Sequence, residues 1–194
     1  MKRSFFQISL NIITYLLIVL CLTFLLEYGI NLSIKFISDP QLINSFTFLI
    51  TFKNKLIPLL DYNLYFRVCI SIILFIFLTY EFIHRLLFDS ILNLFKSIYY
   101  TINLRLFLKL RTNSKEQQNQ IYSSFNFMTQ KSSIDIRRNT IRVYIKMPRS
   151  QQAQKLLRDM ETDLKADISY QNPNYYFAEP VRKGNTLWII GTRR

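Results

Sequence analysis

The stretch "FFQISLNIITYLLIVLCLTFLL", residues 5–26, carries no charged side chain. A helix that crosses the hydrocarbon core of a bilayer needs about 20 apolar residues at a rise of about 1.5 Å each. The stretch meets that length and predicts a transmembrane helix. A cleaved signal peptide can also begin with a basic segment such as "MKRS", but no small-residue cleavage pattern follows Leu26. We therefore expect residues 5–26 to be retained as a membrane anchor.

A second apolar run, "VCISIILFIFLTY", covers residues 68–80. It reaches spanning length if Arg67 and Arg85 mark the two membrane interfaces and Glu81 lies near one end, where a charged group stays partly hydrated. The sequence thus predicts a second transmembrane helix at about residues 67–85.

The distribution of basic residues predicts the orientation of these helices. The chain has a formal net charge of +13, and 19 of its 25 Lys and Arg residues follow His84. Lys and Arg are retained preferentially on the cytosolic side of a membrane. We expect a bacterial cytoplasmic-membrane protein with both termini in the cytosol and residues 27–66 as an outer loop.

Residues 86–110 alternate apolar and charged side chains at helical spacing. This pattern predicts a juxtamembrane helix that either continues the second span or lies along the inner leaflet. A third crossing is the alternative, and it would place the C-terminus outside the cell. Residues 111–130 begin with the polar segment "RTNSKEQQNQ" and are predicted to be a linker, so the membrane region is expected to occupy residues 1–110.

Short elements replace long apolar runs in residues 131–194. "IDI" and "IRVYIKM" predict one β-hairpin, and "YYFAE" and "TLWII" predict another around "KGN". Between them, Ser150 is a candidate N-cap for a helix with an apolar stripe. The fold class predicted is therefore an α+β membrane protein, with two transmembrane helices and a small cytosolic ββαββ domain.

Motifs for catalysis are not found in the sequence. The three glycines cannot build a phosphate loop, and one histidine with two cysteines cannot supply a Cys/His metal site. The acidic residues Asp159, Glu161, Asp163 and Asp167 follow the spacing of a solvated helical face. We predict that the chain is not an enzyme and has no catalytic, metal-binding or cofactor-binding residues.

Basic side chains in the C-terminal domain are the remaining candidates for a functional site. They cluster at the two predicted hairpin tips, on one strand face and at the C-terminus: Arg137, Arg138, Arg142, Lys146, Arg182, Lys183, Arg193 and Arg194. Such residues can neutralise the phosphates of DNA or bind the headgroups of an anionic membrane. Their spacing does not select between these two ligands.

The order of the elements resembles the start of the FtsK/SpoIIIE-type DNA-transfer ATPases of Gram-positive conjugative elements. These proteins have a basic start, two spans joined by an outer loop, and a membrane-proximal domain in which a strand like "NTIRVYIKMP" precedes a helix like "SQQAQKLLRDMETDL". The resemblance covers most of the chain, but the nucleotide-binding motor that follows in the family has no counterpart before "GTRR". No catalytic residue is carried over.

The resemblance implies a non-enzymatic membrane scaffold in a conjugation or type IV secretion-like apparatus. The expected partners are membrane lipids, further copies of the chain, and a motor ATPase or relaxase complex, with DNA contact as a further expectation. The alternative is a two-span effector or sensor in anti-phage defence, in which the cytosolic domain binds a signal and the spans disrupt the membrane.

Overall fold

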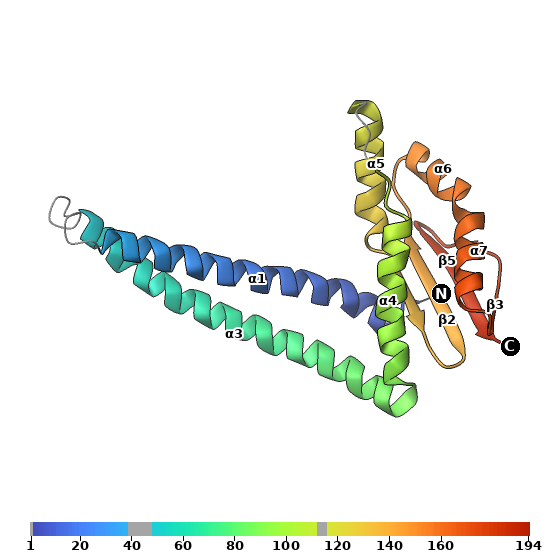
Figure 1. Ribbon diagram of the computed structural model, residues 1–194, viewed down its shortest axis with the longest axis horizontal. Coiled ribbons are helices and arrows are strands. Elements are labelled where there is room, and N and C mark those ends of the chain that lie inside the picture. Colours follow the sequence, from blue (N-terminus) through green and yellow to red (C-terminus); the bar gives the residue numbers. More distant parts are fainter. Residues whose placement is uncertain (1, 39–47, 112–115) are drawn as a thin grey trace. The chain divides into compact units, whose positions relative to one another are not determined.

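The structure is a computed structural model that describes residues 2–38, 48–111 and 116–194. The chain forms two compact units. One is a helical hairpin unit, residues 9–80, and the other is an α+β unit that combines residues 1–8 with residues 81–194. Figure 1 shows the helices and strands that make up these units.

Two long helices, α1 (Phe5–Ile37) and α3 (Phe48–Phe88), form the helical hairpin unit. The first turn of α1 and the last turns of α3 belong to the α+β unit instead. Both helices are long and apolar enough to cross a membrane. Only 11% and 17% of the residues in their most apolar windows are buried, so their apolar side chains are mostly exposed. This exposure is typical of helices that face lipid and not of helices in a protein core.

The helices extend beyond the predicted spans. Their lengths are 33 and 41 residues, which corresponds to about 50 Å and about 60 Å at 1.5 Å per residue. The predicted loop 27–66 is therefore wrong for residues 27–37 and 48–66, which are helical. Helical structure continues because Glu27 and Lys35 are good helix formers, and even Pro58 is accommodated inside α3. Residues 39–47 of that loop lie outside the described residues.

The sheet of the α+β unit is antiparallel and contains five strands: β1 (Ser133–Ile136), β2 (Thr140–Lys146), β3 (Tyr175–Phe177), β4 (Val181–Arg182) and β5 (Thr186–Arg193). The strand order is β1-β2-β5-β3, and β4 also pairs with β5. Both predicted hairpins are present. The two hairpins are joined through β2 and β5, which pair with each other along most of their length. In this pair Val143 is opposite Ile189 and Tyr144 is opposite Trp188.

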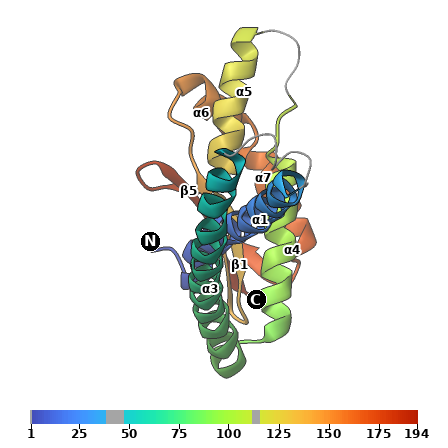
Figure 2. The ribbon, with the colours of Figure 1, turned by 90° about the vertical axis from the view of Figure 1, so that its left-hand side faces the viewer.

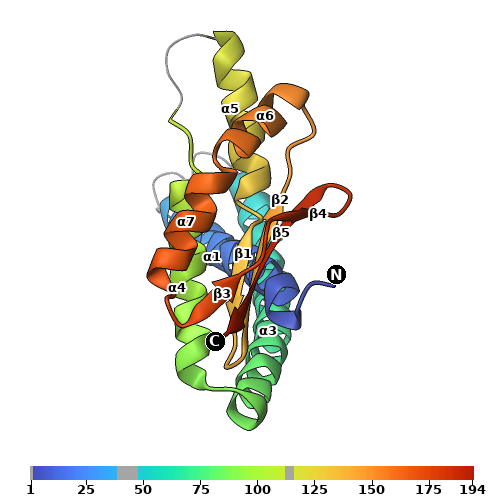
Figure 3. The ribbon, with the colours of Figure 1, turned by 90° about the vertical axis from the view of Figure 1, so that its right-hand side faces the viewer.

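One face of the sheet is covered by helices. These are α4 (Ile91–Phe107), α5 (Glu116–Thr129), α6 (Gln151–Asp159) and α7 (Glu161–Gln171), and Figure 3 shows α6 and α7 against the strands. Side chains of β2 alternate between the two faces of the sheet, and Ile141, Val143 and Ile145 are fully buried on this face. The helices contribute the rest of the core, including Leu104, Leu108, Phe125, Ala153, Leu157, Leu164 and Ile168.

The segment after β2 begins as the sequence predicts. The side chain of Ser150 accepts a hydrogen bond from the backbone N–H of Ala153 and caps α6. The predicted single helix is divided, however, because α6 ends at Asp159 and α7 begins at Glu161. The bend at Met160 lets Leu157 and Leu164 both reach the core.

The α+β unit is larger than the predicted domain 131–194. The predicted juxtamembrane helix 86–110 becomes α4, which starts after the N-cap Ser90 and packs along β1 (Figure 2). α4 is not among the described helices that are long and apolar enough to cross a membrane, and its Leu92, Phe95 and Leu106 side chains remain exposed. Its position along the inner leaflet stays a prediction. The predicted linker 111–130 is wrong from residue 116 onward, because α5 buries Phe125 in the core; residues 112–115 lie outside the described residues.

The start of the chain packs against part of the second face of the sheet. The Gln7 side chain is fully buried and its Nε2 donates to the backbone oxygen of Arg142 at 2.9 Å. The Arg3 guanidinium lies 5.2 Å from the centroid of the Tyr144 ring. Tyr144 is only 3% exposed, and it packs edge-on against Trp188. The N-terminus is therefore part of the α+β unit.

Candidate functional site

The eight basic candidates separate into groups at opposite ends of the sheet. Arg137 and Arg138 lie in the β1–β2 turn, and the register brings Arg193 and Arg194 to the same end. The contact is direct at the backbone, because the N–H of Arg193 donates to the carbonyl of Asn139 at 3.0 Å. The structure thus brings together four arginines from two distant segments.

The other end of the sheet carries Arg182 at the end of β4 and Lys183 in the turn between β4 and β5. Lys146 is opposite Thr186 and belongs to this end as well. Arg142 lies between the two groups, exposed on the second face, where it is opposite Ile190. The eight candidates therefore do not form one continuous patch.

Two of the candidates are engaged in ion pairs. Arg182 Nη2 lies 2.6 Å from Glu161 Oε1, and Arg137 Nε lies 3.1 Å from Asp135 Oδ2. Arg138, Lys183, Arg193 and Arg194 are exposed. A phosphate or carboxylate group would meet these four side chains first.

The most unusual electrostatic site lies where α3 reaches the sheet. Arg85 has no exposed surface, and its guanidinium Nε donates to Glu81 Oε1 at 2.9 Å. Its Nη1 donates to Asp89 Oδ2 at 2.6 Å and to the carbonyl of Ile136 at 2.6 Å. Its Nη2 pairs with Asp135, which is also fully buried. We call Glu81, Arg85, Asp89 and Asp135 the Arg85 cluster.

The Arg85 cluster carries more negative than positive charge. Three carboxylates surround Arg85, and Arg137 adds a second cation at Asp135. Asp89 also accepts from Asn93 Nδ2 at 2.8 Å and from the backbone N–H of Arg138 at 2.9 Å. Glu81 Oε2 is buried and has no hydrogen-bond partner among the described residues.

The Arg85 cluster was not predicted from the sequence. Arg85 was expected to mark a membrane interface, which stays a prediction, but its side chain bonds to β1 inside the α+β unit and does not extend into solvent or lipid. The spacing of Glu81, Arg85 and Asp89 at four residues was a usable signal, since such residues are neighbours on one helical face. Asp135 gave no signal, because "IDI" has the appearance of an ordinary half-buried strand.

A second, partly exposed charge pair lies inside the helical hairpin unit. Arg67 of α3 pairs with Glu27 of α1, and its guanidinium lies 4.6 Å from the centroid of the Phe24 ring. Asn63 Nδ2 also donates to the carbonyl of Thr23 at 3.0 Å. Glu27 directly follows the uncharged run 5–26, and Arg67 directly precedes the uncharged run 68–80. The pair therefore lies at the limit of both apolar segments.

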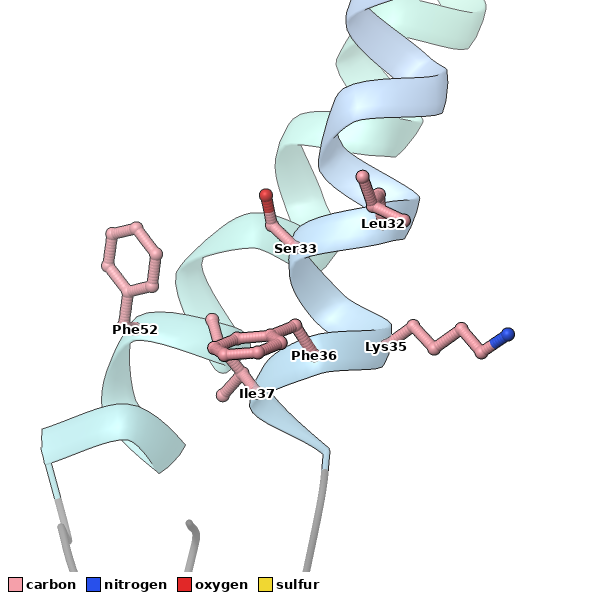
Figure 4. Close-up of a pocket in the computed structure, with 6 residues that line it drawn as sticks. All are labelled: Leu32, Ser33, Lys35, Phe36, Ile37 and Phe52. Atoms are coloured by element: carbon pink, nitrogen blue, oxygen red, sulfur yellow. The ribbon is translucent and has the colours of Figure 1, made fainter.

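An open groove of about 720 Å³ lies in the helical hairpin unit. It is lined by Leu32, Ser33, Lys35, Phe36, Ile37 and Phe52. Figure 4 shows that the amino group of Lys35 points away from the other lining side chains. Its described lining side chains are mostly apolar, with Ser33 and Lys35 as the polar ones.

Metal ligands do not gather in the part of the chain that the structure describes. No group of three or more His, Cys, Asp or Glu side chains there is placed to hold an ion. Cys21 and Cys69 are exposed thiols on the two long helices. The candidate functional features are thus the two basic ends of the sheet and the two charge clusters.

Comparison with known proteins adds no further identification. No protein-family model, no curated protein and no solved structure matches this chain. The functional argument therefore rests on the residues and contacts of the chain itself.

Proposed function

We propose that the protein is a non-enzymatic scaffold in a bacterial cytoplasmic membrane, in which two helices anchor a cytosolic α+β unit that docks a motor ATPase or relaxase complex for DNA transfer. The observation that carries this proposal is the Arg85 cluster. It ties the last turns of an apolar helix to β1 through a buried guanidinium. This pairing makes the last turns of α3 part of the α+β unit.

The N-terminal segment supports an even number of crossings. Residues 1–8 and residues 81–194 form one compact unit, in which Gln7 binds the backbone of Arg142. Segments that fold together lie on the same side of a membrane. Two crossings, by α1 and α3, satisfy this condition, and the excess of Lys and Arg after His84 favours the cytosol as that side.

The DNA-transfer assignment rests on the resemblance in element order. A chain with a basic start, two apolar helices and a strand–helix domain would assemble around a transfer path and present its α+β unit to soluble partners. The exposed arginines at one end of the sheet would then face a partner or its DNA. Electrostatic contacts of this kind weaken steeply as salt is raised.

Gene deletion in a host that transfers a plasmid tests the proposal. We expect transfer frequency to fall and to be restored by the wild-type gene. A photo-crosslinker at the exposed Tyr176 should capture the motor ATPase or relaxase, whereas a crosslinker at Tyr15 on α1 should not. Unchanged transfer after deletion, together with no captured partner, would refute the scaffold.

The Glu27–Arg67 pair favours a second candidate function, a two-span effector in anti-phage defence. Charged residues in apolar helices often mark an ion or water path. If the helices disrupt a membrane, Glu27→Gln with Arg67→Gln should abolish the loss of membrane potential during infection. If the potential is never lost in cells that produce the wild-type chain, the effector function is excluded.

A further inference from the structure

The two edge regions of the sheet differ in whether their outward backbone groups have hydrogen-bond partners. At the β1 edge, the Ser97 hydroxyl accepts from the N–H of Ile136 at 2.8 Å, and the Thr101 hydroxyl accepts from the N–H of Ile134 at 2.9 Å. Arg105 Nε donates to the carbonyl of Ser132 at 3.0 Å. These three residues are spaced four apart on α4, so one helical face satisfies the outer backbone groups of β1. No further strand can pair there.

The opposite edge is made by β3 and β4. Both pair with β5 on the side that β2 does not occupy, and no described strand lies outside them. Tyr176 is 66% exposed and Val181 is 45% exposed at this edge. Open edges of this kind are ready templates for pairing with another chain.

The register identifies which backbone groups point outward. The N–H of Ala178 donates to the carbonyl of Ile190, and the N–H of Arg194 donates to the carbonyl of Asn174. Because hydrogen-bonded positions alternate along an antiparallel pair, the groups of Phe177 and the carbonyl of Tyr175 point away from β5. The N–H of Tyr175 also points outward but bonds to the carbonyl of Asn172 at 3.1 Å.

The charges beside this edge select the occupant. Arg193 and Arg194 lie at the β3 end, and Arg182 and Lys183 lie at the β4 end. Glu179, between β3 and β4, is paired with Lys165, and Arg182 is paired with Glu161, so the cations outnumber the carboxylates at this edge. A second copy of the chain pairing edge to edge would bring these like charges together at a cost. An acidic strand would instead meet cations at both of its ends.

We propose that an extended acidic segment of a partner protein adds as a strand along β3, with its carboxylates at Arg193 and Arg194 and at Lys183. This inference deepens the proposed function, because it names the surface through which the scaffold docks its partner. Main-chain bonds to Tyr175 and Phe177 supply the pairing, and the flanking charges supply the selectivity. Pro180 separates β3 from β4, so the added strand pairs mainly with β3.

Fluorescence anisotropy with the purified full-length protein in detergent tests the inference. The probe is a labelled peptide of alternating glutamate and valine, and the control peptide has prolines in place of the central valines. We expect the first peptide to bind and to slow hydrogen exchange at the Phe177 amide. Lys183→Glu combined with Arg194→Glu should weaken binding at least about tenfold, or about 1.4 kcal/mol.

Two control variants separate strand addition from general attraction. Arg158→Glu on α6 carries the same change per residue but is distant in the fold from β3, and it should leave affinity unchanged. Gly191→Ala should abolish binding, because the new Cβ would lie 2.6 Å from Cε1 of Phe177 and would displace β3. Equal binding of the proline peptide, or an unchanged Phe177 amide, would overturn the inference.

Self-association is a separate outcome. If the Phe177 amide becomes protected with rising protein concentration and no peptide, a second copy occupies the edge and the inference is wrong. The scaffold proposal is tested independently by plasmid transfer. Loss of transfer on gene deletion without peptide binding would leave the scaffold standing and remove only the docking edge.

Discussion

Arg85 donates hydrogen bonds to three carboxylates and a carbonyl while having no exposed surface. Each charge in such a cluster loses several kcal/mol of hydration, and only the mutual pairing offsets this loss. The cluster therefore contributes little net stability as a whole, but the removal of one member is costly. The fully buried Asp135 depends most on its partner.

We expect Arg85→Met to destabilise the α+β unit by about 3–5 kcal/mol, because it leaves buried carboxylates without their cation. Urea unfolding in detergent, followed by the fluorescence of Trp188, the single tryptophan, measures the change. Arg138→Met removes an exposed arginine nearby and should cost under about 1 kcal/mol. Equal effects of the two substitutions would show that the cluster is dispensable.

Tyr144 links stability to alkaline pH. Burial raises the pKa of Tyr144 above its ordinary value of 10.0, and the nearby Arg3 acts in the opposite direction. The unfolded chain loses this proton first as the pH rises, so the contribution is complete below about pH 10 and is lost above it. Tyr144→Phe should reduce the fall in the urea midpoint between about pH 9 and 11. The prediction fails if wild type and variant fall in parallel.

At the scale of elements, α4 is best understood as the cover of a sheet edge. Its apolar residues Leu104 and Leu108 enter the core, while Ser97, Thr101 and Arg105 bind the backbone of β1. A buried backbone N–H without a partner costs about 1–3 kcal/mol. Because the Ser97 and Thr101 hydroxyls accept hydrogen bonds from the outward N–H groups of β1, this edge strand can be buried.

Thr101→Val keeps the shape of the side chain and removes the hydroxyl that the Ile134 N–H uses. We expect a loss of about 1–3 kcal/mol in the free energy of unfolding, with a similar loss for Ser97→Ala. Ser124→Ala, at an exposed position of α5, is the control and should change stability by under about 0.5 kcal/mol. If Thr101→Val matches this control, the edge bonds are not important for stability.

At the scale of the whole molecule, the composition of the α+β unit constrains the topology. Its sheet needs residues 1–8 from before the first apolar helix and residues 81–194 from after the second. Both segments must reach the same compartment before the unit can form. Residues 1–8 therefore contribute to the fold of the α+β unit as well as to the orientation of the chain in the membrane.

We expect both ends of the chain to be protected from a membrane-impermeant maleimide in intact cells. In a background with Cys21→Ser and Cys69→Ser, the single-cysteine variants Lys2→Cys and Arg194→Cys should be labelled only after lysis. Lys55→Cys on α3, near the other end of the hairpin, should be labelled in intact cells. Different behaviour of the two terminal cysteines would contradict the topology.

The sequence by itself determined the elements with strong local periodicity. The two apolar helices, the alternating strand β2, the Ser150 cap and both hairpins follow from patterns within a few neighbouring residues. Helix ends were less predictable: α1 continued to Ile37 and α3 began by Phe48, because nothing in the flanking residues forces a helix to stop. The eight basic candidates lie on strands, in turns and at the C-terminus, but their separation into two ends follows only from the strand order.

Only the tertiary structure decided which polar groups are buried. Arg85 meets Asp135 across 50 residues of sequence, Thr101 meets Ile134 across 33, and Gln7 meets Arg142 across 135. Each partner alone resembles an ordinary polar residue near a membrane or in a short strand. Their pairing depends on how the sheet, α3 and α4 pack together, because the cost of removing a charge or N–H from water is offset only by a partner at the right distance.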